Sequence, residues 1–266
     1  MAVEGSQVNL LTAFVASVFR ACQIAAVVTG TRNSSCPQTL YIFAKQPVAG
    51  RVKTRLVPPL GKEQAARCHR AFLEDSVRRM ATLAGAKLCV ASDSAPWDEL
   101  RELAAQVGAG LETQGPGDLG ERMQRVLARA PAASVVIMGA DSPDLPVSYV
   151  RGAFDALADH DVVVGPAEDG GYYLIGARAV VPPVFSLKAA WGSSGVLAET
   201  LEKLENAGLS FSLLAPWADV DDYQGLRALA ERIDCMKEQG QESGGVSTLG
   251  ATIGVLDSLR REGIEL

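Results

Sequence analysis

Segments of strand length alternate with segments of helix length from residue 39 onward, and this alternation restricts the fold more than any other feature. The predicted strands are short apolar runs, whereas the stretch 62–84 places Leu73, Val77 and Met80 on one helical stripe. Strands are expected at 39–44, 87–91, near Leu111, 134–138, 161–164, 172–176 and 210–214, and helices at 62–84, 97–106, 121–130, 147–158, 195–208, 223–232 and 255–261. Strands that alternate with helices across short loops run parallel with right-handed crossovers, so the sequence predicts an open α/β sheet flanked by helices.

The domain organisation follows from where this alternation begins and ends. No internal repeat or linker interrupts it, so residues 39–235 are expected to form one catalytic domain, and 236–266 a tail with a short helix. Residues 1–38 are interpreted as a non-catalytic N-terminal extension. Its apolar run contains Arg20, which would cost about 2.5–3.5 kcal/mol at a bilayer centre, and lacks the basic start of a signal peptide. Membrane contact by this segment is therefore not expected.

The composition narrows the class of ligand. The net charge is −6, which argues against nucleic acid as a partner because such binding depends on neutralising phosphates. The five cysteines are scattered and never spaced CxxC, so neither a zinc site nor a disulfide framework is predicted, and a reducing cytoplasm is the expected location. His69 and His160 are the two histidines, and neither lies near a nucleophile elbow, which argues against a Ser-His-Asp hydrolase.

The loop after the first strand is basic. In FAKQPVAGRVKTRL, residues 43–56, the cations Lys45, Arg51, Lys53 and Arg55 surround a hinge at Gly50. Ligands of open α/β sheets bind beyond the carboxyl ends of the strands, and lysine and arginine both suit phosphate oxygens. A phosphorylated small molecule is the expected ligand; the alternative is a solvated basic loop.

Acidic loops follow later strands. In GADSPDLP, residues 139–146, Asp141 comes directly after a buried strand and is expected to contact a metal or a ligand. Asp144 and Ser148 are interpreted as caps of the following helix. In GDLGER, residues 117–122, Asp118 and Arg122 stand at a helix start, where a capping role would explain Asp118.

Two further segments carry carboxylates. GPAEDGGYYLIG, residues 165–176, combines Glu168 and Asp169 with two glycines; this pattern is typical of a hairpin turn, whose tip can also carry a catalytic acid. In ADVDD, residues 218–222, Asp222 is expected to cap the next helix, which leaves Asp219 and Asp221 spare. Trp191 either packs in the core or against a ring of the substrate.

A cationic loop together with carboxylates at neighbouring strand ends describes a site for a diphosphate held by a divalent cation. Carboxylate oxygens without histidine or thiolate favour a hard ion, so Mg²⁺ or Mn²⁺ is the expected cofactor. Such an ion would neutralise charge on a leaving diphosphate.

The motifs FAKQPVAGRVKTRL, GADSPDLP, GPAEDGGYYLIG, WGSSG and DVDD occur in an order and spacing that resembles the DUF2064 group of nucleotide-diphospho-sugar transferases with the GT-A fold. That group includes glycosyltransferases associated with arsenosugar biosynthesis, and the resemblance covers residues 39–232. It implies a GT-A-like fold with an open, mostly parallel sheet. Many GT-A enzymes have a DxD motif where this chain has Asp141-Ser142-Pro143-Asp144, so Asp141 stands in for the metal-binding carboxylate. More distantly, the chain is similar to the guanylyltransferases of coenzyme F420 and molybdenum-cofactor synthesis.

Three hypotheses about function follow. The first is glycosyl transfer from a nucleotide-diphosphate sugar to a small-molecule acceptor; the alternatives are nucleotidylyl transfer from a nucleoside triphosphate with release of pyrophosphate, and a non-catalytic nucleotide-binding module. Asp169 is expected to be the catalytic base, and Asp141 and Asp221 the metal ligands. The expected nucleotide-binding residues are Lys45, Gly50, Lys53, Arg55, Asp93, Asp118 and Arg122. The expected acceptor-site residues are Glu168, Gly170, Gly171, Tyr172 and Trp191.

Overall fold

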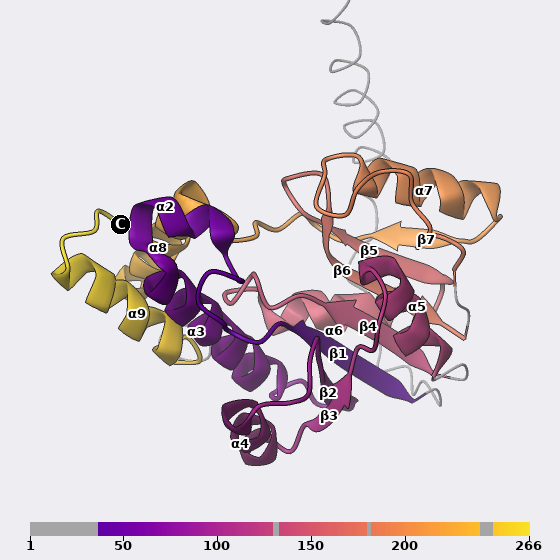
Figure 1. Cartoon of the computed structure of the whole chain (residues 1–266). Coiled ribbons are helices and arrows are strands. Elements are labelled where there is room, and N and C mark those ends of the chain that lie inside the picture. The colour runs from indigo at the N-terminus through magenta and orange to yellow at the C-terminus, as the bar shows by residue number, and fades with distance from the viewer. Residues whose placement is uncertain (1–36, 130–132, 180–181, 240–246) are drawn as a thin grey trace, which may run out of the picture. The chain divides into compact units, whose positions relative to one another are not determined.

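Seven strands form one sheet in the computed structural model, which describes residues 37–129, 133–179, 182–239 and 247–266 (Figure 1). These residues belong to one unit, Cys36–Leu266. The N-terminal extension lies almost wholly outside the described residues and stays a prediction. The strands are β1 Gln38–Ala44, β2 Ala86–Ser92, β3 Gly110–Thr113, β4 Ser134–Met138, β5 Val162–Pro166, β6 Tyr172–Arg178 and β7 Phe211–Leu213.

The order across the sheet is β3-β2-β1-β4-β6-β5-β7. β1 lies between β2 and β4 and runs parallel to both, and β5 runs parallel to β7. β6 is antiparallel to its neighbours β4 and β5, and it follows β5 through the Asp169-Gly170 turn as a hairpin. The predicted α/β fold with an open, mostly parallel sheet is confirmed.

The helices are α2 Val57–Leu60, α3 Lys62–Met80, α4 Asp98–Val107, α5 Leu119–Ala128, α6 Val147–Ala156, α7 Val196–Asn206, α8 Tyr223–Glu238 and α9 Gly250–Arg261, with a 3-10 turn, η1, at Thr54–Leu56. Alternating side chains of β1 face opposite sides of the sheet. Leu40 and Ile42 pack in one core with residues of α3, α4 and α6, whereas Tyr41 packs in a second core with residues of α5 and α7. The sheet is therefore buried on both faces. Among the described residues, no helix has both the length and the apolar character that crossing a membrane requires.

A third core joins α3 to α2, α8 and α9, which gather around it on the left of Figure 1. The buried carboxylate of Asp75 on α3 accepts hydrogen bonds from the backbone N–H groups of Ala251 (3.1 Å) and Thr252 (2.7 Å), at the start of α9. The segment 236–266, which the sequence sets apart as a tail, thus contributes α9 to the same unit as the sheet.

Two local predictions need correction. The sequence does not predict α2, although Pro58 and Pro59 lie in its first turn, where a missing N–H costs nothing. Asp144 does not cap α6, since the helix begins after Pro146 and has no side-chain cap. Instead, the carboxylate of Asp144 is fully buried and accepts a hydrogen bond from Nε of Arg232 at 2.7 Å.

Candidate functional site

The site forms where the loops after β1 and β4 meet. Because these strands are parallel neighbours, the basic loop 45–55 and the acidic loop 139–146 leave the same edge of the sheet. The segment 218–222 joins them, since the N–H of Val220 donates to the carbonyl oxygen of Asp141 at 3.0 Å. Three of the charged segments that the sequence singles out are therefore brought together.

Lys53 lies at the centre of this site and bridges two carboxylates. Its Nζ is 2.5 Å from Oδ1 of Asp141 and 3.1 Å from Oδ1 of Asp221, and only 4% of its side chain is exposed. Lys53 is therefore not an exposed loop cation, and its predicted role in nucleotide binding stays a prediction. The predicted metal ligands and a predicted phosphate ligand instead form one ion cluster, which we call the Lys53 cluster (Lys53, Asp141 and Asp221).

The backbone at Lys53 is in the left-handed conformation, with φ 45° and ψ 47°. This conformation costs a non-glycine residue about 1–2 kcal/mol and persists only where surrounding contacts fix it. Here the residue that adopts it is the one whose ammonium reaches both aspartates. The strain and the ion pairs therefore concern the same residue, which is typical of functional sites.

The charges in the cluster stabilise one another. Burial alone would lower the pKa of Lys53, but the carboxylates of Asp141 and Asp221 raise it above its ordinary value. Burial would likewise raise the pKa of Asp141, but the Lys53 ammonium holds it below its usual range. Lys53 and Asp141 are therefore both charged at neutral pH.

His69 reaches the same site from α3. Its Nε2 donates to the carbonyl oxygen of Lys45 at 3.1 Å, and its Nδ1 lies 3.9 Å from Oδ1 of Asp141. Burial lowers the pKa of His69, so the ring is neutral at pH 7. No motif in the sequence assigns a role to His69 in the site. The signal that could have found it is its place on a buried helical stripe with Ala65 and Phe72, where a titratable residue is out of pattern.

Asp219 is a second residue that the sequence leaves without a role. Its Oδ1 accepts a hydrogen bond of 2.7 Å from the buried hydroxyl of Ser142. Burial, together with the nearby charges of Asp141 and Asp221, raises the pKa of Asp219 to about 7. It is therefore a carboxyl group poised between its two protonation states near neutral pH.

The other cations of the basic loop are exposed. Lys45, Arg51 and Arg55 are open to solvent, and Nη1 of Arg55 lies 3.7 Å from Oδ2 of Asp221. Gly50 turns the loop with a φ of 78°, a conformation that favours glycine. Asp93, at the end of β2, accepts a hydrogen bond from the N–H of Gln46 at 3.0 Å, so it fixes the start of the loop.

Asp118 and Arg122 have structural partners beside the basic loop. Asp118 forms a reciprocal capping box with Glu121 at the start of α5, which confirms the capping role. Nη1 of Arg122 donates to Oε1 of Gln114 at 3.2 Å. The buried Gln114 in turn donates to the carbonyl oxygens of Ala44 and Ala91, and so ties the ends of β1 and β2 together. No pattern in the sequence singles out Gln114.

The β5–β6 hairpin contributes exposed carboxylates. Oδ1 of Asp169 accepts a hydrogen bond from the N–H of Gly171 at 2.9 Å, and Glu168 is also exposed. A Cβ atom at Gly170 would lie 2.5 Å from the carbonyl oxygen of Ser194, so only glycine fits this turn. Trp191 is half-buried and packs edge-on against Tyr172 with ring centroids 6.3 Å apart. Trp191 therefore packs against a residue of the chain itself.

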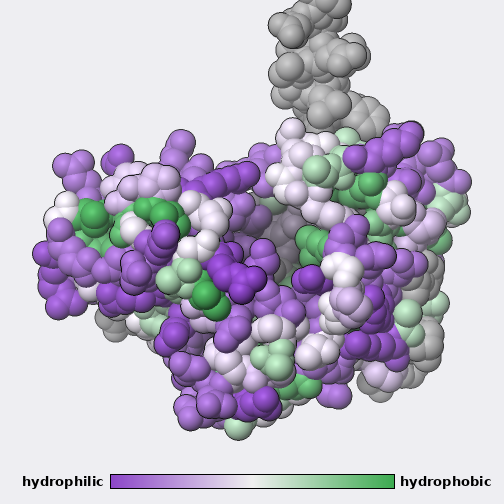
Figure 2. Space-filling view, viewed as in Figure 1, coloured by the Kyte–Doolittle hydropathy of each residue, from purple (hydrophilic) through white to green (hydrophobic). Residues whose placement is uncertain are grey.

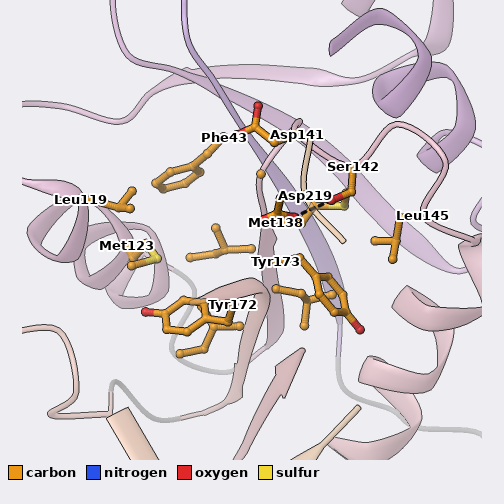
Figure 3. A pocket seen from close by; sticks show the side chains of 14 residues that line it. Phe43, Leu119, Met123, Met138, Asp141, Ser142, Leu145, Tyr172, Tyr173 and Asp219 are labelled. Carbon is orange, nitrogen blue, oxygen red and sulfur yellow. Dashed lines mark hydrogen bonds between the residues drawn. The ribbon is translucent and has the colours of Figure 1, made fainter. Parts of the chain in front are cut away.

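A pocket of about 180 Å³ lies next to the Lys53 cluster (Figure 3). Its polar residues are Asp141, Ser142 and Asp219, and apolar side chains from β1, β4, α5 and β6 line the rest. Figure 2 shows a hollow between the region of α2 and α3 and the region of α5, with hydrophilic residues around much of its rim.

The donor set fits a divalent cation in part. Across the described ranges, no group of three or more His, Cys, Asp or Glu residues is arranged to hold a metal ion. Carboxylate oxygens of Asp141 and Asp221 nevertheless converge on one positive charge, the Lys53 ammonium. In proteins, Mg²⁺ is usually held by one or two carboxylates together with the phosphates of the substrate.

Comparisons with known proteins agree with this architecture. Residues 76–193 match the family model described as "Uncharacterized protein conserved in bacteria (DUF2064)". A "putative nucleotide-diphospho-sugar transferase" from Desulfovibrio desulfuricans G20 is similar to this chain, with 32% identity, coverage of 83% of this chain and 97% of that one, and a TM-score of 0.69. No curated protein matches the chain.

Two more distant structures share the fold alone. A cytidylyltransferase from Leptospira borgpetersenii serovar Hardjo-bovis is 11% identical, with 86% of this chain and 95% of that one covered and a TM-score of 0.51. A nucleotidyl transferase from Methanothermobacter thermautotroptrophicus is 13% identical, with coverage of 73% and 97% and a TM-score of 0.50. The agreement of motifs, fold and the Desulfovibrio relative shows that the chain belongs to the DUF2064 family and has the fold of nucleotide-diphospho-sugar transferases.

Proposed function

We propose that this protein is a glycosyltransferase that moves a sugar from a nucleotide-diphosphate donor to a small-molecule acceptor. The observation that carries the proposal is the Lys53 cluster, where Lys53 pairs with Asp141 and Asp221 beside a loop of exposed cations at the carboxyl ends of β1 and β4. Similarity to the Desulfovibrio relative, named for nucleotide-diphospho-sugar transfer, supports the same class.

The exposed cations would bind the diphosphate of the donor. Lys45 and Arg55 are free to approach phosphate oxygens, and Gly50 lets the loop backbone come close to them. Arginine suits phosphate through its planar fork, and lysine acts as a point charge. Asp93 would support binding indirectly, because it holds the backbone of Gln46 at the loop's start.

Asp141 and Asp221 would hold a Mg²⁺ or Mn²⁺ ion, which when bound would neutralise charge on the departing diphosphate. Both carboxylates contact Lys53 in this structure. Binding the ion would therefore release the Lys53 ammonium, which could then contribute its charge to the phosphates. Asp219 and His69 would border this site without being needed as ligands.

The transfer step forms a bond between the acceptor oxygen and the anomeric carbon of the sugar. The bond from that carbon to the diphosphate breaks, and its electron pair leaves with the nucleoside diphosphate. The acceptor's hydroxyl proton passes to a base, a role that we assign to the exposed carboxylate of Asp169 at the hairpin tip. The charge of Asp169 contributes to the raised pKa of Asp219, a residue that lines the pocket, and this supports the assignment.

Calorimetric titration with a panel of nucleotide-diphosphate sugars in the presence of Mn²⁺ tests this proposal. At least one should bind, and slow hydrolysis to the nucleoside diphosphate should be detectable without an acceptor. Asp221→Asn should weaken Mn²⁺-dependent binding. Asp222→Asn is a matched control, since Asp222 caps α8 and asparagine caps equally well. Binding of nucleoside triphosphates but of no nucleotide sugar would refute the proposal.

Nucleotidylyl transfer is the second candidate, and the number of exposed cations favours it. Lys45, Arg51 and Arg55 together offer enough positive charge for a triphosphate. Two structures with the same fold are named for nucleotidyl or cytidylyl transfer. Release of pyrophosphate from a nucleoside triphosphate in the presence of a phosphorylated acceptor would place this candidate first.

A further inference from the structure

We propose that the pocket beside the Lys53 cluster binds an aromatic or branched apolar group of the acceptor, so that the acceptor is a hydroxyl compound with an apolar body. This inference rests on the proposed glycosyl transfer and names the class of its second substrate. It starts from three side chains that meet at one end of the pocket, Phe43 of β1 and Leu119 and Met123 of α5 (Figure 3).

Leu119 is the first observation that points to a ligand. It is 41% exposed and is the one large hydrophobic residue in the described part of the chain that is exposed. Its neighbour Asp118 caps α5 through a capping box, so the helix start needs no further contact from Leu119. An apolar side chain in the pocket wall gains stability only when a ligand covers it.

The size of the pocket is the second observation. Its volume is about 180 Å³. A protein cavity of about 150 Å³ lined by apolar side chains accepts benzene, so this pocket has room for one six-membered ring or a branched alkyl group.

The third observation is that, apart from the carboxylates at its acidic end, the pocket offers few free hydrogen-bonding groups. The Ser142 hydroxyl already donates to Asp219, and the Tyr173 hydroxyl donates to the carbonyl oxygen of Ala215 at 3.0 Å. The Tyr172 hydroxyl, which is buried without a hydrogen-bond partner among the described residues, is the exception among these three hydroxyls. A polyhydroxylated group placed here would lose bonds to water without replacing them, which costs about 1–3 kcal/mol for each unpaired group. The pocket therefore selects an apolar group, and its acidic end faces the reacting hydroxyl.

The position of the pocket favours the acceptor over the nucleoside. β4 and β6 line much of the pocket and lie on one side of β1 in the sheet. Asp93, which anchors the start of the basic loop, follows β2 on the other side of β1. A diphosphate on the basic loop would thus have its nucleoside toward β2 and β3 and the transferred sugar toward the pocket.

Ligand-observed NMR, used to measure the binding of benzyl alcohol and of glycerol to the full chain, tests the inference. Benzyl alcohol should bind roughly tenfold more tightly than glycerol, as expected when an apolar ring is buried. Leu119→Gln should weaken benzyl alcohol binding by about threefold to tenfold. Leu60→Gln is the control, since Leu60 is partly buried in the third core and does not line the pocket. Phe43→Leu provides a second variant that keeps the pocket apolar but removes a ring, and it should weaken binding less than Leu119→Gln.

Equal affinity for the two alcohols, or benzyl alcohol binding that Leu119→Gln and Phe43→Leu leave unchanged, would overturn the inference. Displacement of benzyl alcohol by uridine, cytidine, guanosine or adenosine would also overturn it, because the pocket would then take the base. Titration of the same preparation with nucleotide sugars separates the two proposals. Nucleotide-sugar binding without benzyl alcohol binding refutes only the acceptor class, and the reverse result refutes only the glycosyl transfer.

Discussion

Replacing Lys53 with methionine removes the charge at the centre of the site and keeps a side chain of similar length. The sequence alone suggests that a loop cation contributes little to stability, because exposed ion pairs are worth about 0–1 kcal/mol. The structure reverses this expectation, since the Lys53 side chain is 4% exposed and pairs with both Asp141 and Asp221. Lys53→Met would leave Asp141 without its ion-pair partner and Asp221 with only the more distant guanidinium of Arg55, 3.7 Å away.

The size of the effect follows from the exposure of the two aspartates. Breaking a fully buried ion pair costs about 3–5 kcal/mol, and a hydrogen bond to a charged group is worth about 1.5–3 kcal/mol. The side chains of Asp141 and Asp221 are 42% and 44% exposed, so water hydrates their charges once Lys53 is gone. We therefore expect a loss of about 2 kcal/mol, or a fall in Tm of about 4–8 °C for a unit of this length.

Thermal melting of metal-free parent and variant in EDTA measures this effect. Arg51→Met is the matched control, since Arg51 is an exposed cation of the same loop, and its Tm should change little. The lowered pKa of Asp141 fixes the pH dependence: the contribution of the pair is present above the unfolded carboxyl pKa of about 4 and is lost as the pH falls through the lower folded value. Equal Tm values of parent and Lys53→Met at pH 7 would show that the pair contributes nothing to folding.

Three further predictions concern the surrounding carboxylates. Asp221→Asn should weaken the Mn²⁺-dependent binding of nucleotides in calorimetry, whereas Asp222→Asn should retain it. Asp219→Asn should stabilise the metal-free protein at pH 8 and have little effect at pH 4. The pKa of Asp219 is raised to about 7 in the folded protein, so its ionisation costs stability that is lost between about pH 4 and 7. Midpoints of urea unfolding across this pH range measure the effect. Arg232→Met should cost about 3 kcal/mol in urea unfolding, since it leaves the fully buried Asp144 without its 2.7 Å partner.

The sheet was predictable because its strands carry a local signal. β4 is an apolar run buried on both sides, and the predicted range 134–138 agrees with the observed one. The Asp-Gly signal at 169–170 likewise predicts the hairpin, and Asp222 caps α8 as expected. These features depend on a few adjacent residues, so a single sequence contains them.

The partners of the charged residues were not predictable in the same way. Asp144 pairs with Arg232, 88 positions away, and Lys53 reaches Asp221 across 168 positions. From the neighbouring residues alone, Asp144 is expected to cap a helix and Lys53 to face a ligand or solvent, because a charge near a helix start or in a loop usually has those roles. Only the packing of α8 and of the segment 218–222 against the loop 139–146 decides otherwise.

Under the proposed function, we expect the cation and the diphosphate to assist each other's binding at the Lys53 cluster. The Lys53 ammonium has three donors, and two are directed at Asp141 and Asp221, so it cannot neutralise both carboxylates and also bind phosphate fully. A diphosphate alone would add negative charge to this site, and a divalent cation alone would have to displace Lys53. When both bind, the cation satisfies the carboxylates and Lys53 becomes free for the phosphates.

Coupling of this kind is reciprocal, so Mn²⁺ should raise the affinity for a nucleoside diphosphate by the same factor as the diphosphate raises the affinity for Mn²⁺. Titrations of UDP and GDP with and without Mn²⁺ measure that factor, and a value of one for every diphosphate that binds would mean that Lys53 keeps its two carboxylates throughout.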